Sequence, residues 1–293
     1  MRVVDFRSFR GRLVAVVVGL FVAVLAACFL VVAAAARASA RNEIKGELRL
    51  AGTLVVRQLE SRGQQLVAAA RLLSNDVALK TAAAAADQES TRSVLASHRE
   101  RIGVAVLMLV SPEGTVAADT LQPARLGTAF PLSPLLDEAE QAGAASRIVV
   151  MGGGLYRLAF VPVRAPAPIA WLCAGFALDA RSADDFRRLT GLHVSFVRRA
   201  ESGFVVHAST LEGAERDDLR RGVVGSRTDE VIQIGGHPHA SHAEPIGDEV
   251  LVVVQRPLAE TLQPYNRLVV ILFAAGGAGL LLALAGTLSL KSK

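Results

Sequence analysis

The chain has 293 residues, of which 52% are apolar and 20% are charged, and its mean hydropathy is +0.39. This composition excludes a largely disordered chain and indicates membrane segments. The formal net charge of +5 comes from the tails, because residues 1–12 carry +3, residues 291–293 carry +2 and residues 37–267 are balanced. The charge therefore indicates a membrane topology and excludes a nucleic-acid-binding surface.

Two uncharged apolar runs, residues 13–36 and 268–290, are long enough to cross a membrane as helices. Both are flanked by basic residues on the side away from the middle segment, and basic flanks stay in the cytoplasm. We therefore predict that both termini are cytoplasmic and that residues 37–267 lie outside. A cleaved signal peptide is the alternative for the first run, because Ala38-Ser39-Ala40 offers a cleavage pattern.

A helical pattern follows the first run. Apolar residues recur at steps of three, four or seven over residues 37–79, which predicts a long stalk helix with a break and a new cap at residues 74–76. Three glycines each weaken this helix by about 1 kcal/mol, so packing must support it. These are Gly46, Gly52 and Gly63. The next helix is expected over residues 90–101, with Ser90 or Thr91 as its cap and Gly103 at its end.

The apolar period then changes to two, which is typical of strands. The strands expected in the first half cover residues 104–110, 115–119, 147–151, 155–163 and 169–179. A short helix over residues 182–189 comes next. The strands expected in the second half cover residues 192–198, 204–208, 229–235, 239–243 and 250–255. Each half thus has about five antiparallel strands with helices on one side, which predicts an α+β fold of two tandem modules.

The order of elements and two stretches resemble the double Cache sensors of bacterial receptors, as found on diguanylate cyclases, phosphodiesterases and sensor kinases. Residues 72–120 read LLSNDVALKTAAAAADQESTRSVLASHRERIGVAVLMLVSPEGTVAADT, which is similar to the helix–helix–hairpin opening of that family. The segments GGGLYRLAFVPVRAPAPIAWLCAGFALD and DFRRLTGLHVSF are similar to its strand pair and inter-module helix. The resemblance covers about residues 40–290. It implies two transmembrane helices flanking tandem PAS-like Cache modules, with residues 37–267 in the periplasm and the chain in the bacterial inner membrane.

This architecture predicts six segments. They are a cytoplasmic tail (1–12), a first transmembrane helix (13–36), a stalk helix with the membrane-distal module (37–180), the membrane-proximal module (181–257), a juxtamembrane helix with the second transmembrane helix (258–290) and a cytoplasmic tail (291–293). Family receptors continue into a HAMP segment and an output domain, whereas only three residues follow the second span here. We therefore expect an input module with no enzymatic activity of its own.

Tyr156, Arg157 and Trp171 are the candidate ligand-binding residues, because they lie on expected strands of the module in which the family holds its pocket. An arginine on a strand can bind a carboxylate through two hydrogen bonds, and aromatic rings can form pocket walls. The alternative is that Trp171 belongs to the core and Arg157 to the outer face. The residue spacing of the amino-acid-binding family members is absent, so the resemblance does not imply an amino-acid ligand.

A histidine-rich run, His237-Pro238-His239-Ala240-Ser241-His242, is the other candidate for chemistry. Alternate histidines of a strand share a face, and with Glu244 they could form a metal site. The flanking Gly235-Gly236 and Pro245 instead favour an exposed hairpin loop. We therefore expect no metal, no cofactor and no catalytic residue.

Together these patterns predict a membrane-bound signal-transduction sensor that binds a small ligand and passes the signal through its transmembrane helices to a cytoplasmic output or partner. A homodimer is expected because small residues recur every fourth position in both runs. These are Ala15, Gly19, Ala23 and Ala27, and Ala275, Gly279 and Ala283. Three alternatives stay open: a structural or assembly protein whose external domain binds another protein, a metal-dependent external enzyme, and a cleaved, singly anchored protein.

Overall fold

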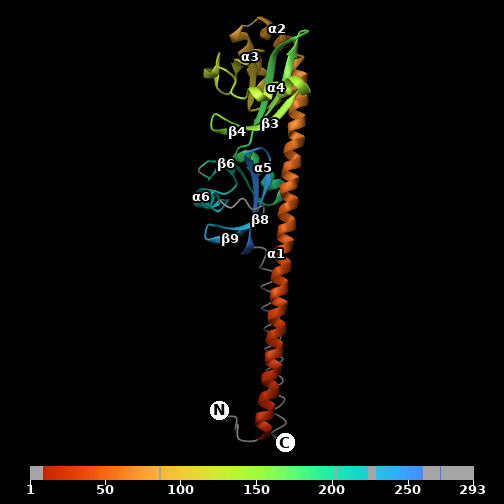
Figure 1. Cartoon of the computed structure of the whole chain (residues 1–293), viewed down its shortest axis with the longest axis vertical. Helices are drawn as coiled ribbons and strands as arrows, with labels where there is room; N and C mark the ends of the chain where they lie inside the picture. The colour runs from red at the N-terminus through yellow and green to blue at the C-terminus, as the bar shows by residue number, and fades with distance from the viewer. Residues whose placement is uncertain (1–8, 86, 202, 224–228, 260–270, 272–293) are drawn as a thin grey trace. The chain divides into compact units, whose positions relative to one another are not determined.

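The computed structural model describes residues 9–85, 87–201, 203–223, 229–259 and 271 (Figure 1). The chain divides into the unit Leu48–Arg256 and a second unit formed by Met1–Glu47 and Pro257–Lys293. The described strands belong to the first unit, except that the last strand ends at Pro257.

Helix α1 (Phe9–Ser74) is 66 residues long and contains both the first predicted span and the predicted stalk. Within the described residues, no helix is both long and apolar enough to cross a membrane. The second predicted span, residues 268–290, lies outside the described residues apart from Ile271. The two predicted transmembrane helices are therefore not confirmed.

The predicted break after the stalk is confirmed. Helix α2 (Val77–Ala85) begins directly after Asp76, whose carboxylate accepts a hydrogen bond of 3.0 Å from the N–H of Leu79. Helix α3 (Gln88–Ile102) ends at Gly103 as predicted, with a φ of 66°. Its predicted cap is wrong, because Asp87 caps this helix by accepting a hydrogen bond from the N–H of Glu89 at 3.2 Å.

Ten described strands form two antiparallel sheets of five strands each. The first sheet holds β1 (Val106–Val110), β2 (Val116–Asp119), β3 (Ala145–Met151), β4 (Gly154–Arg164) and β5 (Pro168–Ala177). The second sheet holds β6 (His193–Ala200), β7 (Gly203–Ser209), β8 (Asp229–Ile234), β9 (His237–Pro245) and β10 (Val250–Pro257). Their strand orders, β2-β1-β5-β4-β3 and β7-β6-β10-β9-β8, are the same, so the predicted tandem α+β arrangement is confirmed.

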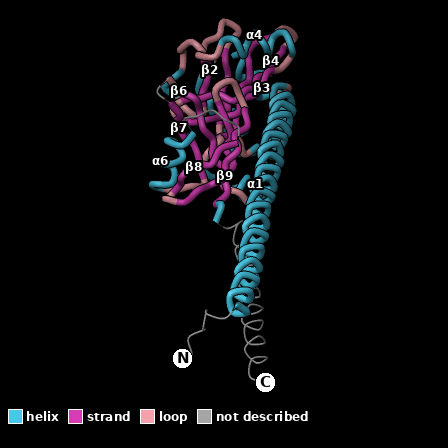
Figure 2. Tube along the Cα trace, turned by 60° about the horizontal axis from the view of Figure 1, so that its bottom comes forward, coloured by secondary structure: helices cyan, strands magenta, loops and turns pink. Residues whose placement is uncertain are grey.

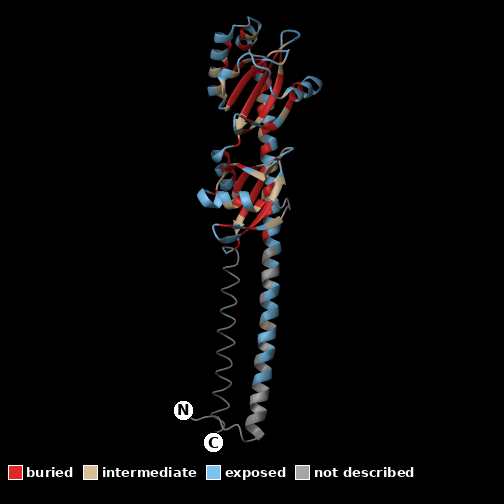
Figure 3. Cartoon of the chain, turned by 60° about the vertical axis from the view of Figure 1, so that its left-hand side comes forward, coloured by how far each residue is buried: buried red, intermediate tan, exposed pale blue. Residues whose placement is uncertain are grey.

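Both faces of each sheet are covered, and the sheets are the most buried part of the unit (Figure 3). On the first sheet, apolar residues of α1, α2 and α3 pack on one face, and α4 (Ser133–Ala142) packs on the other (Figure 2). On the second sheet, α5 (Ala180–Thr190) contacts one face through the ring pair Phe186 and Phe196, and α6 (Gly213–Gly222) covers the other. The expectation of helices on one side only is therefore wrong.

The two helices missed by the sequence, α4 and α6, are only ten residues long each and bury three residues and one residue. Helix α6 buries Leu219 alone among its ten residues. A short helix needs only a few apolar residues to cover a sheet that is already apolar, so its own sequence carries a weak signal.

The histidine-rich run is a strand and not the exposed loop that we predicted. It lies in β9, between β8 and β10, and His239 and His242 are 6% and 2% exposed. The glycines that suggested a loop form the turn before the strand, where Gly235 and Gly236 have φ values of 59° and 75°. A central strand is buried on both faces, which explains why polar residues here are covered.

Candidate functional site

The three predicted ligand-binding residues lie on two different faces of the first sheet. Consecutive residues of a strand point to opposite faces, so Tyr156 and Arg157 of β4 diverge. Tyr156 and Trp171 of β5 belong to the apolar cluster under α4, and Trp171 is 6% exposed. Arg157 lies on the face toward α1, where its guanidinium group covers Gly63. The structure therefore brings Tyr156 and Trp171 to one face and places Arg157 on the other.

Arg157 is held between the sheet and α1. Its Nε donates a hydrogen bond of 3.3 Å to Oγ of Ser146 on β3. Burial lowers the pKa of Arg157, and the negative charge of Glu60 on α1 partly offsets this. This arrangement suits a side chain that holds the helix against the sheet. Its role in ligand binding stays a prediction.

The face under α4 is mostly apolar. The buried side chains that form it include Val106, Met108, Phe130, Leu135, Leu158, Phe160, Trp171 and Cys173. Burial and the nearby charge of Asp119 raise the pKa of the Cys173 thiol well above its ordinary value, so this thiol stays protonated at neutral pH. A charged residue beside such a face needs specific partners.

The charged residue beside the apolar face under α4 is Asp119, whose side chain is fully buried at the end of β2. Its Oδ1 accepts hydrogen bonds from the N–H groups of Leu121 and Gln122, at 2.7 and 3.1 Å. Its Oδ2 lies 4.0 Å from Nη1 of Arg125, at the end of the short helix η1 (Pro123–Arg125). This distance is too long for a hydrogen bond, and both atoms are buried without a hydrogen-bond partner among the described residues.

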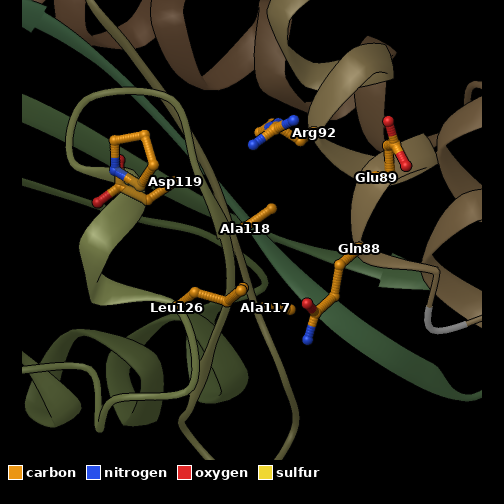
Figure 4. Close-up of a pocket in the computed structure, with 8 residues that line it drawn as sticks. Gln88, Glu89, Arg92, Ala117, Ala118, Asp119 and Leu126 are labelled. Carbon is orange, nitrogen blue, oxygen red and sulfur yellow. The ribbon is translucent and has the colours of Figure 1, made fainter.

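A groove runs beside Asp119, between α3 and β2 (Figure 4). Gln88, Glu89 and Arg92 line it from α3, and Asp119 and Leu126 line it from the opposite side. Its volume is about 290 Å³. Ligand pockets of small molecules start at about this size. Asp119 therefore borders a space that a small molecule can enter, while its partner Arg125 is not among the residues that line this space.

The sequence reasoning missed both Asp119 and Arg125. The signal that could have found Asp119 is its place at the end of a strand, where an aspartate often accepts hydrogen bonds from backbone N–H groups two or three residues on. Nothing in the local pattern shows that Arg125 lies near this carboxylate, because the approach depends on how the loop folds back.

The histidine run does not gather around one point. His237 and His239 share a face of β9, whereas His242 lies on the other face with Glu244. Within the part of the chain that the structure describes, no group of three or more His, Cys, Asp or Glu side chains could hold a metal ion.

Comparison with known proteins agrees with this fold. The V. cholerae sensor domain of the histidine kinase DctB has 15% identity and a TM-score of 0.50, with 74% of this chain and 96% of that chain covered. A domain of a sensory box/GGDEF family protein from Vibrio parahaemolyticus has 11% identity and a TM-score of 0.48, with 76% and 98% covered. No curated protein sequence matches the chain. Residues 41–249 match the family described as the double sensory domain of two-component sensor kinases, and the chain belongs to this double Cache family.

Proposed function

We propose that this chain is the sensory input of a membrane-bound receptor, and that Asp119 and Arg125 bind a small polar ligand. The observation that supports this most directly is the pair of buried, unsatisfied atoms, Oδ2 of Asp119 and Nη1 of Arg125. Leaving such atoms without partners costs about 1–3 kcal/mol each, so an arrangement that keeps them apart suits a ligand that joins them.

The chemistry of the pair limits the ligand. A carboxylate only accepts hydrogen bonds, and a guanidinium group only donates them. A hydroxyl or carboxamide group can accept from Arg125 and donate to Asp119 at the same time. Ala117, Ala118 and Leu126, which line the groove, would then contact the apolar part of the ligand, whereas Tyr156 and Trp171 lie on the other face, under α4. The proposed ligand is therefore a small molecule with at least one hydroxyl or carboxamide group and an apolar portion.

A thermal-shift screen with matched compound pairs tests this site. Each pair consists of a hydroxyl- or carboxamide-bearing compound and its analogue without that group. We expect only the polar member of a pair to raise the melting temperature of the full chain. Removing a group that satisfies buried partners lowers affinity by at least tenfold.

Two variants assign the effect to the site. Asp119→Asn keeps the acceptor for Leu121 and Gln122 and removes the charge, so it should abolish the shift while the apo protein stays folded. Asp137→Asn changes an exposed carboxylate on α4 and should bind as the native chain does. Equal binding by Asp119→Asn and the native chain would exclude the pair as the site.

The membrane part of the proposal is supported by the sequence. The uncharged runs 13–36 and 268–290 and the basic tails support two transmembrane helices with both termini in the cytoplasm and residues 37–267 in the periplasm. In this arrangement the signal passes through the spans to a cytoplasmic output or partner.

We also propose a homodimer that forms along α1. Leu50, Leu54 and Leu72 are 74%, 45% and 79% exposed, and 3.6 residues per turn place them on one side of the helix. Exposed leucines at such spacing favour packing against a second helix. The same helix from a second copy of the chain offers a matching surface.

A further inference from the structure

The groove beside Asp119 is the middle part of a longer groove along β2, which is an edge strand of the first sheet. A wider part at the end of β2 has a volume of about 440 Å³, and a third part at the start of β2 has a volume of about 260 Å³. The middle part shares Arg92 and Asp119 with the wider part, and it shares Ala117 and Leu126 with the third part. Residues 115–120 line the whole groove and extend over about 15 Å. The groove therefore suits an elongated small molecule.

Two arginines of α3 line the wider part of the groove. Arg92 and Arg99 are seven residues apart, which is close to two helical turns, so both lie on the side of α3 that faces the groove. Figure 4 shows Arg92 and Asp119 on opposite sides of this space. Neither Arg92 nor Arg99 has an ion-pair partner among the described residues. Guanidinium groups that border a cavity without such a partner can donate hydrogen bonds to an anionic group.

The charged side chains at this end of the groove sum to +1. The carboxylate of Glu89 lines the same space as Arg92 and Arg99. The carboxylate of Asp119 has Arg125 at a distance of 4.0 Å. Three guanidinium groups and two carboxylates leave one positive charge. A ligand with a single negative charge makes the sum zero, and the two carboxylates repel an anion of higher charge.

The third part of the groove offers mainly apolar contacts. Apolar side chains from α2, β1, β5 and the loop after η1 line it, and they include Ala83, Leu109, Leu126, Ile169 and Ala170. None of the described residues that line this part is charged. Its hydroxyl groups already have partners, because Thr91 donates to the carbonyl of Asp87 and the hydroxyls of Ser111 and Thr115 bond to each other. This end therefore suits an apolar chain.

We propose that the sensor binds an amphipathic carboxylic acid along this groove. The carboxylate contacts Arg92 and Arg99, a hydroxyl or carboxamide group lies beside Asp119, and an apolar chain lies against the part that Ile169 lines. N-acyl amino acids and hydroxy fatty acids carry these three groups in this order. The assignment rests on the proposed function, because its middle group is the one that Asp119 binds.

The charge of the ligand is tested with N-hexanoylglycine and N-hexanoylglycinamide, in which a neutral amide replaces the carboxylate. Thermal shifts of the full chain in lipid nanodiscs are compared at matched free concentrations. We expect the acid to bind about ten- to a hundredfold tighter, because its hydrogen bonds to the guanidinium groups are charge-assisted. Equal binding of the acid and the amide would overturn the proposal while leaving a ligand site at Asp119 intact.

Two substitutions assign the carboxylate to the arginines. Arg92→Gln and Arg99→Gln should each reduce the preference for the acid, and the double variant should abolish it. Glutamine has a helix propensity close to that of arginine, so α3 should stay folded. Arg71→Gln changes an exposed arginine of α1 that does not line the groove, and it should bind both compounds as the native chain does. A preference for the acid that survives in the double variant would reject the assignment.

The length of the apolar chain is tested with N-acetylglycine. Each buried methylene strengthens binding about fourfold, so N-hexanoylglycine should bind more than about tenfold tighter than N-acetylglycine. Ala83→Leu fills the apolar end and should remove this advantage, whereas Ala84→Leu changes the exposed neighbouring residue and should keep it. An advantage that Ala83→Leu does not change would overturn the placement of the chain.

Failure of this proposal can be distinguished from failure of the ligand site itself. If neither N-hexanoylglycine nor β-hydroxyoctanoate binds at millimolar concentration, while other compounds still give a thermal shift that Asp119→Asn abolishes, the ligand class is rejected and the site at Asp119 stands. If no compound gives a shift that depends on Asp119, both the site and the ligand class are rejected.

Discussion

Gly63 of α1 lies directly under the guanidinium group of Arg157, so that a Cβ atom at position 63 would be 2.7 Å from Cζ of Arg157. Gly52 has the same relationship to His242. Arg157 and His242 lie on β4 and β9, which hold the same position in the two sheets, and the two glycines are eleven residues apart. Eleven residues are three helical turns at 3.67 residues per turn, so both glycines face the same side of α1. Each module thus places one nitrogen-bearing side chain over a glycine of the same helix.

Two alanine substitutions test whether close packing requires a glycine at position 52, with position 46 as the control. An alanine at position 46 meets no atom within 4 Å, so Gly46→Ala should leave the melting temperature unchanged or raise it, because alanine favours a helix by about 1 kcal/mol. In Gly52→Ala the new methyl group presses on the His242 ring, which Asp229 and Glu244 hold in place. We expect Gly52→Ala to be less stable than Gly46→Ala by about 1–3 kcal/mol. Equal effects of both substitutions on thermal unfolding would contradict this.

The substitution Arg157→Ala distinguishes a role of this residue in holding α1 against the sheet from a role in ligand binding. The substitution removes the hydrogen bond to Ser146 and the packing of the side chain over Gly63. We expect the free energy of unfolding in urea to fall by about 1–2 kcal/mol. Arg164→Ala, at the exposed end of the same strand, serves as the control and should change stability little. An unchanged apo stability combined with loss of a ligand-induced thermal shift would instead support the role in ligand binding that the sequence suggested.

We expect Asp76 to make part of the free energy of unfolding depend on pH in the acid range. The N–H of Leu79 lowers the pKa of this carboxyl, burial opposes the shift, and the charges of His98 and Arg101 add to it. A lowered folded pKa gives a contribution that is complete above the ordinary value of 3.8 and is lost as the pH falls through the lower folded value. Asp76→Asn keeps the cap without titrating, so its stability should fall less than that of the native chain between pH 6 and pH 3. The difference should be below about 1 kcal/mol because the side chain is 33% exposed.

Cysteine crosslinking tests the proposed dimer along α1. In a Cys28→Ala background, Leu54→Cys should form a disulfide between subunits, because the leucine is exposed on the proposed contact face. Thr53→Cys lies about 100° around the helix and should crosslink much more slowly. Cys173 can remain, since its buried thiol stays protonated and unreactive. Equal crosslinking at both positions would argue against this face.

Reporter fusions test the topology. Fusions at Met1 and Lys293 should report the cytoplasm, because the basic tails are retained there, and a fusion near Gly213 should report the periplasm. A periplasmic carboxyl tail would contradict the two-span arrangement.

Much of the fold follows from patterns that neighbouring residues create. The step of three, four or seven along α1, the break at residues 74–76 and the alternating strands are local consequences of covering one side of a helix or sheet. These patterns suffice to predict two tandem α+β modules. They are weak for α4 and α6, which are short and bury only three residues and one residue against neighbouring strands.

The candidate sites depend on tertiary structure. Alternation along β4 shows that Tyr156 and Arg157 diverge, but only the packing of α1 and α4 decides which face each of them meets. Asp119 and Arg125 are close because a loop turns back over the sheet. Strand pairing brings Asp229 to His242, and α1, far away in the sequence, supplies Arg49 to Asp229. The sequence alone determined the elements and their order, because burial imposes a local period. Only the tertiary structure decided which charges meet, because that depends on register and on helix placement.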